Sequence, residues 1–238
     1  MLYKSTRGQS PAVPFSEVLL GGLAPDGGLY VPEEFPNFTQ KEIEAMASLS
    51  FSEVAAKILF PFVSGEIDRE TFSNLVKDTY RVFEDEDVVK LVESGDERWI
   101  LELFHGPTLA FKDVAMQLLG ALLDYFSKKQ GRKIAVLGAT SGDTGAAAIA
   151  ACSRFSNVDI FILYPHGRVT EVQRKQMTTS EATNVHALAI ESDFDGCQAL
   201  VKEMFLDESL MQEDTRFIAA NSINWTRCMT QSVYFFWS

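Results

Sequence analysis

The stretch KIAVLGATSGDTGAAAIAA, residues 133–151, decides the fold that we predict for this chain. Its first part, Lys133–Leu137, is a short apolar run of the kind that forms strands covered on both faces. A glycine-rich loop follows at Gly138–Gly145, and an alanine-rich helical pattern begins at Gly145. A strand, a tight loop and a helix in this order form the unit from which parallel sheets are built.

The same alternation continues on both sides of this unit. Strands are predicted at Trp99–Phe104, Val158–Tyr164, Val185–Ile190 and Arg216–Ala219, and helices at Asp113–Lys129, Thr170–Ser180, Phe194–Phe205 and Thr226–Trp237. Asp113 is the expected N-cap of the first of these helices. The sequence therefore predicts an α/β protein with a parallel, doubly wound sheet, in which ligands bind beyond the carboxyl ends of the strands.

The region before residue 93 has a different pattern. Gly21-Gly22 and Pro25–Gly28 are turn signals, and helical patterns follow at 41–47, 51–59 and 68–80, with Ser52 and Asp68 as expected starts. We therefore expect two domains: 1–92, small and mainly helical, and 93–238, the α/β domain. Thr226–Trp237 ends in uncapped aromatic residues, which a native surface rarely leaves bare, so we expect the second domain to be incomplete.

Composition excludes several classes of function. The 238 residues are 46% hydrophobic and 23% charged, as in soluble globular proteins, and no apolar run approaches the about 18 residues of a membrane span. The net charge of −12 argues against nucleic acid and anionic membranes as partners. The three cysteines, Cys152, Cys197 and Cys228, form no CxxC pair, and the N-terminus has no signal-peptide core. We expect free thiols, no metal site and a cytoplasmic location.

The segment HGPTLAFKD, residues 105–113, places Lys112 between a predicted strand and a helix. Leu109, Ala110 and Phe111 precede it, and a lysine desolvated by apolar neighbours has a lowered pKa. Its neutral amine can attack an aldehyde and form a Schiff base. The alternative is an ordinary lysine at a helix N-terminus, where the helix dipole disfavours a cation.

The glycine-rich loop Gly138–Gly145 presents backbone N–H groups and hydroxyls at a helix N-terminus, which favours an anion site. It is no phosphate-binding Walker loop, because no lysine follows Gly145, and it lacks the GxGxxG pattern of dinucleotide-binding proteins. The alternative is a tight turn that Ser141 or Asp143 caps.

The segment AANSINWTR, residues 219–227, follows a strand and precedes a helix. Asn221, Ser222, Asn224 and Arg227 can converge on one anion, since arginine offers a planar donor fork that suits phosphate. The alternative is a polar helix cap with a solvated arginine.

Taken in order along the chain, these segments resemble the threonine synthases of the fold-type II pyridoxal-phosphate family. Tyr3–Gly8, Gly22–Pro32 and Tyr164–Met177 resemble the same family. The resemblance implies that Lys112 binds the cofactor aldehyde and then shuttles protons. It places Asp143 and Thr144 at the cofactor. The implied substrate ligands are Thr140, Ser141, Gly142 and Thr144 for the α-carboxylate, Asn221, Ser222 and Arg227 for the phosphate, Asn224 for the turn and Arg168 for added positive charge.

Asp143 departs from many relatives, which have asparagine there; a carboxylate at the cofactor's 3′ oxygen needs a proton or a positive partner. The implied reaction converts O-phospho-L-homoserine and water to L-threonine and phosphate, that is, it is a carbon–oxygen lyase reaction. The chain resembles only the N-terminal half of these enzymes and lacks a second glycine cluster for the cofactor phosphate, so we expect it to be inactive alone. The alternatives are a threonine or serine dehydratase and a non-catalytic threonine-synthase-like binding protein.

Overall fold

The computed structural model describes residues 1–210, 214–219 and 224–238. The chain divides into two compact units. The first unit comprises Met1–Leu118 with Ile223–Ser238, and the second comprises Leu119–Ser222. The predicted domain border after residue 92 does not coincide with the borders of these two units, and it stays a prediction.

The second unit is built on a four-stranded parallel sheet with the order β7-β6-β5-β8. Its strands are β5 (Lys133–Ala139), β6 (Val158–Pro165), β7 (Val185–Ile190) and β8 (Thr215–Ala219). The chain runs outward from β5 through β6 to β7, then returns to the other side of β5 as β8. This reversal of strand order puts a topological switch point beside β5, where such sheets bind ligands.

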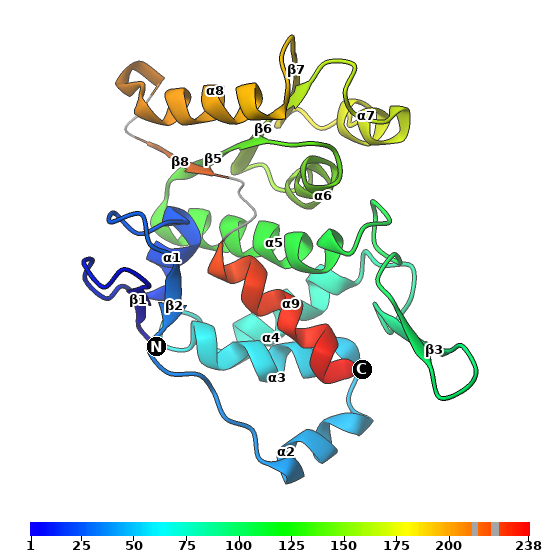
Figure 1. The fold of residues 1–238 in the computed structure, drawn as a ribbon. Coiled ribbons are helices and arrows are strands. Elements are labelled where there is room, and N and C mark those ends of the chain that lie inside the picture. The colour runs from blue at the N-terminus through cyan, green and yellow to red at the C-terminus, as the bar shows by residue number, and fades with distance from the viewer. Residues whose placement is uncertain (211–213, 220–223) are drawn as a thin grey trace. The chain divides into compact units, whose positions relative to one another are not determined.

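Helices cover both faces of this sheet, which confirms the doubly wound fold predicted from the sequence. Figure 1 shows α8 (Phe194–Leu206) on one side and α6 (Asp143–Cys152) on the other. Cys197 and Val201 of α8 pack on Leu137 and Leu163, two of the side chains that point to that face. The other elements are α7 (Glu171–Thr178), the short 3₁₀ helix η2 (Glu208–Leu210) and the end of α5 (Lys112–Gln130), which begins in the first unit.

The first unit is mainly helical, as predicted for the start of the chain. Its helices are α1 (Phe15–Gly21), α2 (Gln40–Glu44), the 3₁₀ helix η1 (Ala45–Ser48), α3 (Phe51–Val63), α4 (Arg69–Tyr80) and α9 (Trp225–Trp237). Helix α1 was not predicted, nor was the antiparallel pair of β1 (Tyr3–Ser5) with β2 (Tyr30–Pro32). The strand β4 (Trp99–Glu102) was predicted as part of the parallel alternation, but it pairs antiparallel with β3 (Lys90–Glu93), which was not predicted.

Helix caps decide where α3 and α4 begin. Asp68 caps α4 by accepting from the Thr71 N–H, as predicted. Ser52 was the wrong start for α3, since the N-cap is Ser50. Ser50 and Glu53 form a reciprocal capping box, in which the Ser50 hydroxyl accepts from the Glu53 N–H and the Glu53 carboxylate accepts from the Ser50 N–H.

The last helix, α9, packs on elements from the first 90 residues. The Asn224 side-chain amide donates to the Leu19 carbonyl at 3.2 Å, and the Trp237 indole N–H donates to the Val89 carbonyl at 3.2 Å. The Trp237 ring also meets Phe51, with ring centroids 5.6 Å apart. The aromatic end expected to be bare is thus partly covered, while Phe235 remains 71% exposed.

The thiols behave as the sequence predicted. Cys152 and Cys197 are buried, Cys228 is exposed, and all three are free. Burial raises the pKa of the Cys152 thiol to about 12. Within residues 1–210, 214–219 and 224–238, no helix is both long and apolar enough to cross a membrane.

Candidate functional site

Lys112 is the first residue of α5 and is half-buried. Its Nζ atom lies 4.8 Å from the centroid of the Phe111 ring, close enough for a cation–π contact. The predicted apolar setting is only partly present, because Leu109 is 64% exposed and Phe111 is 42% exposed. The loop turns these side chains outward, and Leu109 itself has a left-handed φ of 61°.

Asp113 is not the N-cap that the sequence predicted, because α5 already begins at Lys112. Its carboxylate is buried and points back to the preceding loop. Oδ2 accepts from the Thr108 N–H and Oδ1 from the Thr108 hydroxyl, both at 2.7 Å. A Cβ on Gly106 would lie 2.5 Å from the Asp113 Cβ, so only glycine fits there. Burial raises the pKa of Asp113. These contacts hold the strained loop that aims Lys112.

Replacing Asp113 by alanine should destabilise the fold, because it leaves two buried donors of Thr108 without that acceptor. We expect the free energy of unfolding in urea to fall by about 2–4 kcal/mol. The exposed Asp195 on α8 provides the matched control, for which Asp195→Ala should change stability by no more than about 0.5 kcal/mol. Equal losses in the two variants would show that the carboxylate of Asp113 does not hold the loop.

In the glycine-rich loop, Thr140 makes the organising contacts. Its buried hydroxyl oxygen accepts from the N–H of Gly142 at 3.0 Å and from the N–H of Gly145 at 2.9 Å. The N-cap of α6 is Gly142, with no side-chain cap, so Ser141 and Asp143 do not cap the helix. The helix begins at Asp143, two residues before the predicted start. A Cβ on Gly145 would lie 2.5 Å from the Thr140 Cγ2, so a larger residue would disrupt the loop.

Three of the remaining predicted residues of the second unit, Ser141, Asp143 and Thr144, belong to the same loop. Ser141 is exposed, and Asp143 and Thr144 are half-buried. Arg168 is exposed on the turn between β6 and α7, next to Gly167 with its φ of 68°. The sheet is parallel, so this turn and the glycine-rich loop lie at the same edge, beyond the carboxyl ends of β6 and β5.

The predicted phosphate segment is described only in part. Asn221 and Ser222 lie outside the described residues. Asn224 is the N-cap of α9: its Oδ1 accepts from the Thr226 N–H at 2.8 Å, and its amide donates to Leu19. These bonds account for its support of the turn, while a contact to substrate stays a prediction.

Arg227, in the first turn of α9, is only 7% exposed. Its Nη1 has no hydrogen-bond partner among the described residues. Burial lowers the pKa of the guanidinium. The alternative of a solvated arginine is therefore wrong. Burying a cation with an unsatisfied N–H donor costs free energy unless an anion pairs with it. This side chain therefore has the properties of an anion ligand.

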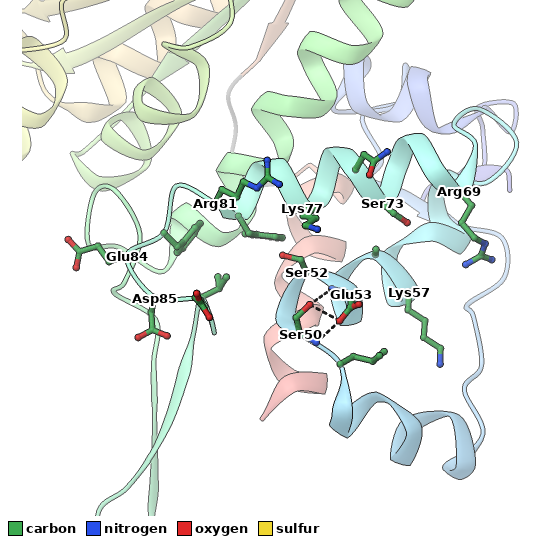
Figure 2. A pocket seen from close by; sticks show the side chains of 17 residues that line it. Ser50, Ser52, Glu53, Lys57, Arg69, Ser73, Lys77, Arg81, Glu84 and Asp85 are labelled. Atoms are coloured by element: carbon green, nitrogen blue, oxygen red, sulfur yellow. Dashed lines mark hydrogen bonds between the residues drawn. The ribbon is translucent and has the colours of Figure 1, made fainter.

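A cavity of about 770 Å³ lies in the first unit between α3, α4 and the segment 83–88 (Figure 2). Its walls carry charges of both signs, among them Lys57, Lys77 and Glu84. None of the predicted site residues lines it.

The residues present fit a pyridoxal phosphate at two points. Lys112 supplies a primary amine, and the start of α6 at Asp143 supplies a helix N-terminus, which favours an anion. In the sequence after Gly145, no glycine-rich loop follows that could take the cofactor phosphate.

Two family models match the chain in succession: the threonine synthase N terminus over residues 2–80 and the pyridoxal-phosphate dependent enzyme over residues 90–230. The chain belongs to the pyridoxal-phosphate dependent enzymes. Within this family it corresponds to the N-terminal half of the threonine synthases, as the resemblance of the sequence motifs implied. These matches do not favour the alternatives, a threonine or serine dehydratase and a non-catalytic binding protein.

The similarity to relatives of known sequence and structure extends along the whole chain. The threonine synthase of Pseudomonas aeruginosa is 53% identical over 236 residues, covering 99% of this chain and 50% of that protein. The crystal structure of PLP-bound threonine synthase from Brucella melitensis has a TM-score of 0.94 at 51% identity, over 99% of this chain and 51% of that one. The yeast threonine synthase structure has a TM-score of 0.92 at 40% identity, over 99% and 49%. The chain thus spans about half the length of the curated relatives it matches.

The contact of Asp113 with Thr108, which holds the loop before Lys112, was not predicted from the sequence. The Thr108–Asp113 pair is a contact across a loop whose path the sequence does not determine. By contrast, Thr170 and Gln173 follow the pattern Thr-x-x-Gln of a capping box, which is readable from the sequence and marks the start of α7.

Proposed function

We propose that this chain forms the N-terminal half of a threonine synthase, which converts O-phospho-L-homoserine and water to L-threonine and phosphate. The observation that carries the proposal is Arg227 at the end of the segment AANSINWTR, a buried guanidinium whose Nη1 has no partner among the described residues. A phosphate on the substrate would accept the hydrogen bond that Nη1 of Arg227 otherwise lacks. The 53% identity with the threonine synthase of Pseudomonas aeruginosa along the chain supports the assignment to a threonine synthase.

Bound pyridoxal phosphate supplies an electron sink for carbanions at the substrate's α and β carbons. In this proposal the Lys112 amine holds the cofactor aldehyde and, once released, takes and returns protons at those carbons. The contact of Asp113 with Thr108 holds the loop before α5, which supports a defined backbone position for Lys112.

The other residues bind and orient. Thr140, Ser141, Gly142 and Thr144 are proposed to meet the substrate α-carboxylate at the N-terminus of α6, where the helix dipole favours an anion. Asp143 and Thr144 would face the cofactor. Arg227 would hold the substrate phosphate together with Asn221 and Ser222, and Arg168 would add positive charge. Such local sites are needed because the net charge of −12 repels an anionic substrate.

The site favours this reaction over that of a serine or threonine dehydratase, because substrates without a phosphate leave Arg227 unsatisfied. A non-catalytic binding protein would have no use for Lys112 at the head of α5. We further propose that the reaction takes place in the cytoplasm and belongs to the carbon–oxygen lyases that act on phosphates.

The test is turnover by the longer protein to which we assign this chain. With pyridoxal phosphate present, it should release inorganic phosphate from O-phospho-L-homoserine and form threonine in equal amounts. Serine should be turned over at least about 100-fold less efficiently, since a buried site built for one polar group strongly rejects ligands that lack it. The isolated 238 residues should give no steady production of threonine. Efficient deamination of serine without phosphate release would support a dehydratase instead.

A further inference from the structure

The side chains of Glu102 and His105 join the end of β4 to the start of the loop that leads to Lys112. The Nε2 of His105 lies 2.9 Å from the Oε2 of Glu102, at hydrogen-bond distance. The His105 ring also lies beside that of Phe104, with centroids 4.7 Å apart. The side chains of His105 and Glu102 are only 17% and 25% exposed, so water screens this contact less than it screens a pair on the open surface. The contact therefore ties the first residue of the segment HGPTLAFKD to β4.

Further contacts hold the segment before β3 against the same two residues. Lys90 on β3 lies opposite Glu102 on β4, and its side chain forms an ion pair with Asp85. The bond to Asp85, and among smaller causes the charge of Glu102, raise the pKa of Lys90. At the other end of this segment, the Glu84 N–H donates to the His105 carbonyl at 3.2 Å. Both the backbone and the side chain of His105 are thus held by neighbouring segments of the first unit.

Two residues in the segments that His105 joins have a strained backbone. Val88, in the turn before β3, has a φ of 63°, and Leu109, in the loop before Lys112, has a φ of 61°. A left-handed φ is uncommon for any residue other than glycine, and for a β-branched residue such as valine it is a clear outlier. Such conformations persist only where surrounding contacts hold them, and they cluster at functional sites. The loop before Lys112 therefore needs contacts that hold its start as well as its end.

The end of this loop is held by Asp113, whose carboxylate accepts from the N–H and the hydroxyl of Thr108. Its start is held by His105. We propose that His105 is a positioning residue for Lys112: through its contact with Glu102 it fixes the start of the loop, and so the backbone position from which the amine of Lys112 acts. This inference rests on the proposed function, in which Lys112 holds the cofactor aldehyde, and it gives His105 a role without a contact to any ligand.

The variants that isolate this contact are His105→Phe and His105→Gln. Phenylalanine keeps a ring beside Phe104 but has no polar atom for Glu102, whereas the side-chain amide of glutamine can replace Nε2 as donor or acceptor. In the cofactor-free, full-length protein, hydrogen exchange at the amides of 108–111 should become about 10-fold faster in His105→Phe, as the loss of one partly buried hydrogen bond predicts. In His105→Gln it should stay within about 3-fold of wild type. Exchange in α3 should change in neither variant, because only the loop is released.

Turnover by the full-length protein distinguishes a positioning role from a contact with substrate. In His105→Phe we expect kcat to fall by about 10–100-fold, because a shift of about 1 Å in a reacting group can cost 10²-fold. The KM for O-phospho-L-homoserine should stay within about 3-fold, since the proposed substrate ligands lie on other segments. His105→Gln should restore kcat to within about 3-fold of wild type. The matched control is His186→Phe, because the His186 ring likewise stacks on a phenylalanine, Phe161, but lies on β7 of the second unit. This control should change neither kcat nor exchange of the loop.

Removing the partner of His105 completes the test. Glu102→Ala keeps the imidazole ring, so it tests the same contact even if His105→Phe does not fold. It should speed exchange of the loop as much as His105→Phe does, and the double variant should be no worse than either single variant, because all three lack one contact. Additive effects, wild-type exchange in His105→Phe, or a His105→Gln variant as impaired as His105→Phe would overturn the inference. A wild-type protein that released no phosphate from O-phospho-L-homoserine would contradict the proposed function, whereas the exchange measurements would still decide whether His105 holds the loop.

Discussion

Replacing Lys112 by alanine in the full-length protein should abolish threonine formation, with a loss of at least about 10³-fold in kcat. The variant removes both the amine that binds the cofactor aldehyde and the group proposed to move protons, and one general acid–base group alone contributes 10²–10⁴-fold. The fold should survive, because Lys112 is a half-buried first residue of α5 and the loop before it is held by Asp113. Phosphate release and threonine formation measure the effect.

A chemical readout separates this role from a general loss of structure. Borohydride reduction of the wild-type protein with pyridoxal phosphate should fix the cofactor to the peptide that contains Lys112. Lys202→Ala, at an exposed position on α8, should leave both the labelling and the turnover unchanged. Labelling at a different lysine, or unchanged labelling in Lys112→Ala, would remove Lys112 from the site.

Changing Arg227 to methionine should damage activity without damaging the fold. We expect kcat/KM for O-phospho-L-homoserine to fall by about 10²–10³-fold, because truncating one partner of a buried, charge-assisted contact costs 2–5 kcal/mol in binding. Any slow turnover of serine should change by less than about 3-fold, since serine carries no phosphate. An arginine that only held α9 in place would show no such difference between the substrates.

The same Arg227→Met variant, which should lose activity, should not lose stability. The guanidinium is buried with Nη1 unpartnered in the described structure, so a methionine of similar length removes an uncompensated polar group. The free energy of unfolding without substrate should stay the same or rise by up to about 3 kcal/mol. Arg81→Met, at a position 66% exposed by its side chain, is the matched control and should change neither stability nor turnover. A large loss of stability in Arg227→Met would indicate a structural role instead.

The sequence predicted the parallel sheet well because the physical signal there is local. Lys133–Leu137, Val158–Tyr164 and Val185–Ile190 are apolar runs that a buried strand needs, and each lies within a strand of the structure. The strands β1, β2 and β3, which were not predicted, have only three or four residues each, too few for a clear apolar pattern. The start of α3 was misplaced because Ser50, which forms a reciprocal capping box with Glu53, is the N-cap and not Ser52.

For the candidate site, the sequence singled out the residues that we propose to meet ligands, but not the contacts that hold the loops around them. Lys112 and Arg227 were singled out by residue type and motif, and the buried state of Arg227 then excluded the solvated alternative. Asp113 was assigned to the wrong role because its partners, Gly106 and Thr108, depend on how the loop folds back. The contact between Gln173 and Asp143 joins residues 30 positions apart and depends on which helices follow adjacent strands, which no local pattern encodes.

The contact of α9 with the beginning of the chain has a consequence for synthesis on the ribosome. The Asn224–Leu19 bond joins residues 205 positions apart, and the second unit, continuous in sequence, lies between them. At about 5–20 residues per second, translation of that insert takes roughly 5–20 s. Throughout this time the rings of Phe51 and Phe62, which α9 later covers with Trp237 and Trp225, have no partner from that helix. The N-terminal part of this chain is thus synthesised before the second unit, yet its own unit is complete only after α9 has been made.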